Sequence, residues 1–103
     1  MATVAEIIAQ MNSKFNADAA AGLDLVFQFN IEDAVYHLII KDGTCAVVEG
    51  AHDDANVTLI MNSETLEGIT TGETDGMQAF MAGQLQAEGD MMLATKLAEL
   101  FPV

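Results

Sequence analysis

Few side chains in this sequence have the types and spacing that catalysis requires. Ser13 and Ser63 are its two serines, and neither stands in a Gly-x-Ser-x-Gly turn that would expose a nucleophile. Cys45 lies in an apolar, strand-like segment, where we expect a buried and unreactive thiol rather than a nucleophilic thiolate. The 16 Asp and Glu residues offer carboxylates for acid–base chemistry, but no spacing selects a pair among them. The sequence also has no Gly-rich phosphate loop or dinucleotide-binding motif, so we predict no catalytic residue and no cofactor.

The two histidines give only weak indications of chemistry. His37 stands between apolar neighbours, which favours a hydrogen-bonded core histidine over a metal ligand or a general base. His52, Asp53 and Asp54 are consecutive polar residues that could contact a cation, but three adjacent loop residues lack the spacing of a metal site. We therefore predict no metal.

Composition excludes several classes of function. The chain has 3 Lys and Arg against 16 Asp and Glu, for a net charge of −13, so it lacks the basic surface that nucleic-acid binding requires. The same charge disfavours docking on anionic membranes. Yet 51% of its 103 residues are hydrophobic, which indicates a folded domain. One cysteine, no basic leader, no membrane-length apolar run and no peroxisomal tail together predict a cytoplasmic protein.

The apolar periodicity predicts a single α+β domain over residues 1–103. Thr3 and Glu6 fit a capping box before an amphipathic helix. Ser63 and Asp90 are the expected N-caps of later helices. We expect helices at 4–15, 63–72, 77–83 and 90–101 and strands at 23–30, 35–40, 45–48, 57–61 and 84–88.

An excess of apolar residues in the second half is the main functional clue. The last predicted helix has apolar residues around about half of its circumference, wider than the ~100° stripe that docking on a core needs. Five of the seven methionines also lie in this half: Met61, Met77, Met81, Met91 and Met92. Methionine suits surfaces that repack around varied apolar partners. Three interpretations remain open: core filling, a lipid-sized cavity, or an apolar face for a partner.

Within residues 56–97 the order of residues is specific enough to indicate a family. Ala55-Asn56-Val57-Thr58-Leu59 precedes Ser63, Leu66 and Thr71-Gly72, and the run MQAFMAGQLQAEGD follows at 77–90. Met91, Leu93-Ala94 and Lys96-Leu97 continue the pattern. This segment resembles the sterol carrier protein 2 family, and a looser likeness extends through residues 4–48.

The resemblance implies a five-stranded, mostly antiparallel curved sheet with helices packed on one face, enclosing a hydrophobic tunnel for sterols, fatty acids or fatty acyl-CoA. It implies no catalytic residues. Phe80 and Met81 match paired apolar residues that face the family's cavity, and Met91, Leu93 and Leu97 match a helix that lines it. The expected ligand-binding residues are Phe27, Leu66, Ile69, Met77, Phe80, Met81, Leu85, Met91, Leu93, Leu97 and Phe101.

Two departures from the family pattern concern charge. Gln84 and Gln86 stand where many relatives have lysines. Together with the charge of −13, they argue against binding the phosphates of coenzyme A and against anionic membranes. We predict a non-catalytic intracellular lipid-binding or transfer protein. The alternatives are a protein-interaction module or homodimer that uses the same apolar groove, or an accessory that presents acyl substrates to an enzyme.

Overall fold

Five strands form one mixed, mostly antiparallel sheet in the order β3-β2-β1-β4-β5. The computed structural model describes residues 3–101, except for the side chains at positions 91, 94, 95 and 98. The elements are α1 (Val4–Ser13), β1 (Asp24–Ile31), β2 (Ala34–Lys41), β3 (Thr44–Glu49), β4 (Val57–Met61), α2 (Ser63–Thr71), α3 (Gly76–Met81), β5 (Gln86–Gly89) and α4 (Met91–Leu100). Only the β1–β4 pair is parallel among these described strands. The predicted α+β class and strand order along the chain are confirmed.

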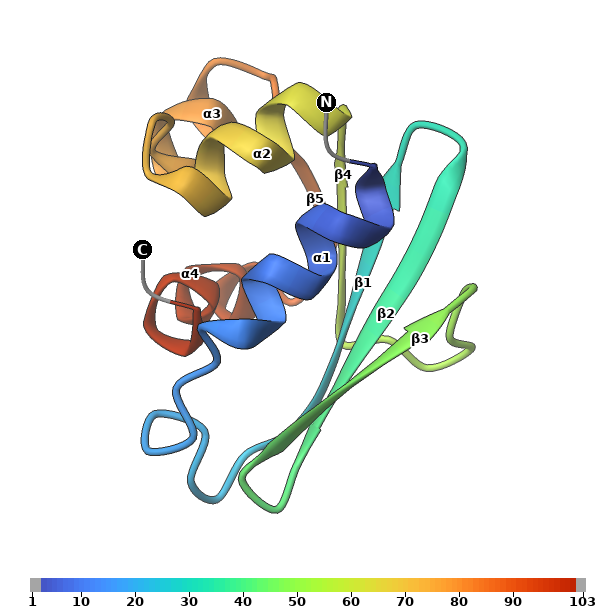
Figure 1. Cartoon of the computed structure of the whole chain (residues 1–103), viewed down its shortest axis with the longest axis vertical. Helices are drawn as coiled ribbons and strands as arrows, with labels where there is room; N and C mark the ends of the chain where they lie inside the picture. The colour runs from blue at the N-terminus through green and yellow to red at the C-terminus, as the bar shows by residue number, and fades with distance from the viewer. Residues whose placement is uncertain (1–2, 102–103) are drawn as a thin grey trace.

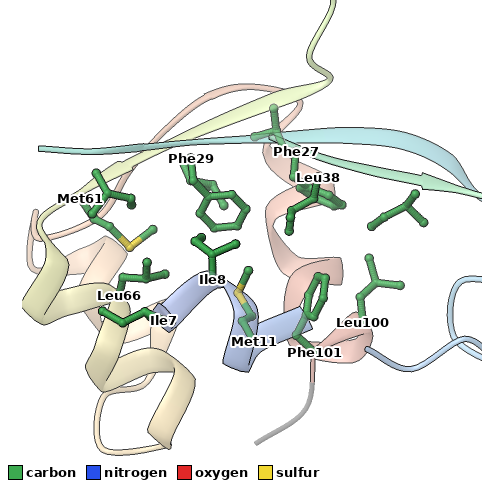
Figure 2. Packing of buried hydrophobic residues seen from close by; sticks show 14 of the residues in the cluster. Ile7, Ile8, Met11, Phe27, Phe29, Leu38, Met61, Leu66, Leu100 and Phe101 are labelled. Carbon is green, nitrogen blue, oxygen red and sulfur yellow. The ribbon is translucent and has the colours of Figure 1, made fainter. Parts of the chain in front are cut away.

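The helices lie on one face of the sheet, and the other face is left without a helix (Figure 1). Alternation along β1 explains this arrangement, because Phe27 and Phe29 are fully buried while Gln28 between them points to the opposite face. Figure 2 shows Ile8 and Met11 projecting from α1 toward the sheet, with Ile8 next to Phe29. The core is therefore a single layer between the sheet and the helices.

Most helix ends follow the predicted caps, with one correction. The Thr3 hydroxyl accepts a hydrogen bond from the Glu6 backbone N–H (3.2 Å), which is one half of the predicted capping box, and it donates to the Glu6 carboxylate at 3.3 Å. Ser63 is not the N-cap of α2: the cap is Asn62, whose side-chain oxygen accepts from the Thr65 N–H at 2.8 Å. The chain leaves β4 directly before Asn62, so that residue has the extended conformation of an N-cap and Ser63 is already helical.

The fifth strand begins two residues later than predicted. The N–H groups of Gln84 and Leu85 both donate to the carbonyl of Ala79, so the turn after α3 continues through Leu85. The strand then reaches Gly89, which pairs with Val57. Gly89 has φ +102°, and a Cβ there would lie 2.6 Å from a backbone oxygen, so the pairing requires glycine.

Candidate ligand-binding cavity

A cavity of about 190 Å³ lies between the sheet and the helices. It exceeds the ~150 Å³ of an apolar cavity that binds benzene. Strands β1 and β4 form one wall, and α1, α2, α4 and the segment around α3 form the others. The lining residues are Met11, Lys14, Phe29, Leu59, Met61, Leu66, Ile69, Thr70, Asp75, Gly76, Met77, Leu85, Leu97 and Phe101.

The interior of this cavity is apolar. Phe29 and Leu59 are paired neighbours on β1 and β4, and both are buried on the face that carries the helices. Leu66 of α2 is also buried, and Figure 2 shows it facing inward together with Met61. Thr70 adds a hydroxyl, but that hydroxyl donates to the Glu67 carbonyl at 3.0 Å. A ligand deep in this space therefore meets almost only hydrocarbon and sulfur.

Charged side chains occur where the cavity reaches solvent. Lys14, Asp75 and Met77 are the lining residues with exposed side chains. The Lys14 ammonium donates to the carbonyl of Thr70 at 3.2 Å, and the Asp75 carboxylate accepts from the Met77 N–H at 3.0 Å as the N-cap of α3. The site thus combines an apolar interior with a charged rim.

Six of the expected ligand-binding residues line this cavity. They are Leu66, Ile69, Met77, Leu85, Leu97 and Phe101. The others lie elsewhere. Phe27 is buried in the core beside the cavity, and Leu93 is partly buried against that core. Phe80 and Met81 are 37% and 74% exposed on the surface of α3, and the Met91 side chain lies outside the described part of the structure.

Several lining residues were not among the sequence predictions. Met11, Phe29, Leu59 and Met61 have apolar positions that fit an ordinary core, and periodicity cannot distinguish a packed wall from a cavity wall. Alternation in β1 and β4 could have placed Phe29 and Leu59 on the helix-covered face. Lys14 gave no sequence signal beyond its position at the end of the first helix.

The histidines have structural partners. The Nδ1 atom of His37 lies 2.8 Å from the Gly50 carbonyl, and the side chain is buried, so the prediction of a buried, hydrogen-bonded histidine is confirmed. Its place in the core was wrong, because His37 pairs with Gln28 and therefore lies on the sheet face away from the helices, outside the hydrophobic core. His52 packs edge-on against His37 with ring centroids 5.1 Å apart, and its Nδ1 accepts from the Asp54 N–H. Among residues 3–101, no group of three or more potential ligands is placed to hold a metal ion.

Cys45 is partly buried on the edge strand β3, and its environment disfavours the reactive form. Burial raises the pKa of the Cys45 thiol to about 11. Because the thiolate is the nucleophile, this thiol is a poor one near neutral pH, as the sequence predicted. No helix within residues 3–101 is long and apolar enough to cross a membrane.

The fold and the cavity define a class of small α+β domains in which helices and a sheet enclose an apolar binding space. Residues 4–102 match the SCP-2 sterol transfer family, and the chain belongs to that family. It is 29% identical over 93 residues to the peroxisomal multifunctional enzyme type 2 of Mus musculus. That match covers 89% of this chain and 12% of the enzyme, so the chain spans a small part of its relative.

Two solved structures contain this fold. The solution structure of palmitated SCP2L2 from Aedes aegypti has a TM-score of 0.74 and 26% identity, covering 99% of this chain and 96% of that one. The stereoselective inverting sec-alkylsulfatase Pisa1 from Pseudomonas sp. has a TM-score of 0.81 at 22% identity, covering 90% of this chain and 15% of that one. The second likeness is one of fold, within a much longer enzyme.

Proposed function

We propose that this chain is a non-catalytic intracellular lipid carrier that holds a fatty acid, a fatty acyl chain or a similar apolar ligand in the cavity between its sheet and helices. The observation that carries the proposal is the apolar cavity of about 190 Å³. Membership of the SCP-2 sterol transfer family and the likeness to a palmitated relative support it.

The energetics of such a site need no polar chemistry. Each buried methylene contributes about 0.8 kcal/mol, so six to eight methylenes supply about 5–6 kcal/mol before the cost of association. An empty cavity also weakens the fold by about 24 cal/mol per Å³, which an apolar ligand can recover. An apolar cavity of this kind is therefore suited to single-chain lipids.

A long acyl chain needs more room than this cavity has, so we propose that the ligand extends past its rim. Met77 lines the cavity and is 52% exposed. Phe80 and Met81 follow it on α3 and are exposed as well. The far end of a long ligand would then contact Phe80 and Met81. We therefore propose both residues as ligand contacts, although neither lines the cavity.

The negative net charge of the chain disfavours two classes of binding partner. With a net charge of −13, the chain is not suited to nucleic acids or to anionic membrane surfaces. We therefore propose that lipid is taken up from solution, from neutral membranes or from a protein partner.

A second role has support from the comparisons. Because this fold forms a minor part of longer enzymes among its relatives, the domain could instead present acyl substrates to an enzyme.

The exposed apolar side chains of α3 also fit a homodimer or another protein contact. A monomer by light scattering at all concentrations, with and without lipid, argues against the homodimer.

The carrier role is tested by native mass spectrometry of the delipidated protein with palmitate. We expect a one-to-one complex. Leu97→Trp places an indole at a cavity-lining position and should abolish the complex, whereas Ile60→Trp should retain it. Ile60 is a matched control because it lies on β4 but alternates with the lining residues and faces away from the helices. Only the apo mass for the wild type, or equal loss of binding in both variants, contradicts the proposal.

A further inference from the structure

One positively charged side chain, that of Lys14, lines the cavity described here. Its presence is notable in a chain with 3 basic and 16 acidic residues. The other two lysines, Lys41 on β2 and Lys96 on α4, do not line the cavity. The chain therefore places one of its few cations on the wall of an otherwise apolar space.

The structure gives Lys14 one anchoring contact. Lys14 is the C-cap of α1, and its ammonium donates to the carbonyl of Thr70 in the last turn of α2. An ammonium has three N–H groups, so this single bond orients the side chain and leaves donors for a ligand. The contact also satisfies a carbonyl near a helix end, where intrahelical partners run out.

The cavity has an apolar interior and a charged rim at Lys14, which is the distribution of polarity that an amphiphilic ligand requires. Buried Phe29, Leu59 and Leu66 form the interior, whereas Lys14 is exposed at the rim. An acyl chain inside would thus place its polar end near the ammonium. The one carboxylate on the described wall, Asp75, already accepts a backbone N–H and disfavours a second anion beside it. An anionic headgroup is therefore best stabilised at Lys14.

We propose that Lys14 is a specificity-determining residue that binds the carboxylate of the ligand, so that the cavity selects free fatty acids over neutral lipids of the same chain length. The inference rests on the proposed lipid-carrier function. It adds the chemical class of the headgroup and the atom that recognises it, the Lys14 Nζ.

The test compares palmitate with 1-hexadecanol, which has the same number of carbons and no charge. The dissociation constants of both are measured by calorimetry with the delipidated wild type, Lys14→Gln and Lys41→Gln, below the aggregation threshold of the lipids. Both substitutions remove one positive charge, so they change the long-range field of the protein alike. Lys14→Gln should lower the preference for palmitate over hexadecanol about fivefold, the scale of a solvent-accessible ion pair. Lys41→Gln should leave it within about twofold.

The outcomes distinguish a failure of the proposed role of Lys14 from a failure of the proposed lipid-carrier function. An unchanged preference in Lys14→Gln overturns the role of Lys14, while palmitate binding by the wild type keeps the carrier function. Failure of the wild type to bind either lipid overturns the carrier function itself.

A second measurement tests the role of Lys14 even if Lys14→Gln does not fold. Lys14→Arg keeps the charge and should keep the preference. A preference that Lys14→Arg loses while folded contradicts the inference.

Discussion

Filling the cavity from one of its walls tests directly whether the space exists. Ile69 is a partly buried residue of α2 that lines the cavity, and Ile7 is a buried residue of α1 that does not. Both belong to helices that cover the sheet, and both can be changed from isoleucine to phenylalanine. Isoleucine and phenylalanine have similar helix propensities, so a difference between the variants reports on packing.

The expected magnitudes follow from the size of the cavity. At about 24 cal/mol per Å³, an enclosed empty space of about 190 Å³ would correspond to about 4.6 kcal/mol of lost packing energy, which is an upper bound for a cavity that reaches solvent at its rim. Because a ring enters unfilled space, Ile69→Phe should change the free energy of unfolding by less than about 1 kcal/mol. Ile7→Phe forces extra atoms into a filled core and should cost about 1–3 kcal/mol.

Urea unfolding followed by circular dichroism measures both variants. Palmitate binding provides the second readout, since Ile69→Phe should weaken it while Ile7→Phe should weaken it less in the protein that remains folded. An Ile69→Phe variant that loses as much stability as Ile7→Phe would refute the cavity. Full stability with unchanged palmitate affinity would refute its role in binding.

Three further predictions concern the fold and the thiol. Gly89→Ala should lose at least about 1 kcal/mol more than Gly50→Ala in urea unfolding: both glycines have positive φ, but a Cβ meets backbone only at Gly89. Iodoacetamide at about pH 8 should alkylate Cys45 much more slowly in the folded protein than in urea, because burial raises the pKa of the folded thiol to about 11; equal rates would contradict this. Asn62→Ala should lower the melting temperature by about 4–8 °C through loss of about 1 kcal/mol, and Ser63→Ala by less; the reverse order would restore Ser63 as the cap.

Much of the fold could be predicted from sequence because local patterns agree with one another. Alternation around Phe27 and Phe29 identified a strand and its buried face, and Asp90 was correctly assigned as a helix cap. The errors occur where two neighbours compete for one role. Asn62 and Ser63 are both good N-caps, and the end of β4 decides between them.

The cavity was harder to predict, for a physical reason. Residues that line an apolar cavity and residues that fill a core have the same composition and the same periodicity. Leu97 was predicted because the family resemblance places it on the helix that lines the cavity, whereas Leu59 was not among the expected ligand-binding residues. Phe80 and Met81 are exposed because α3 has six residues and buries mainly Ala79.

Lys14 shows what sequence alone leaves out. Its position on the cavity depends on α1 lying against α2, a tertiary contact that the local pattern does not encode. Figure 1 shows these two helices side by side over the sheet. The charge of a binding site can thus rest on one residue whose role appears only after the helices are packed.

The most direct test of the lipid-carrier account is an isotope-filtered nuclear Overhauser experiment with ¹³C-labelled palmitate bound to the protein. The account predicts contacts between the acyl chain and Phe29 and Leu59 on the sheet wall of the cavity, and Ile69 on the α2 wall. Contacts confined to the uncovered face of the sheet, for example to Ile39 and Ile60, would contradict it, as would the absence of any contact at saturating palmitate.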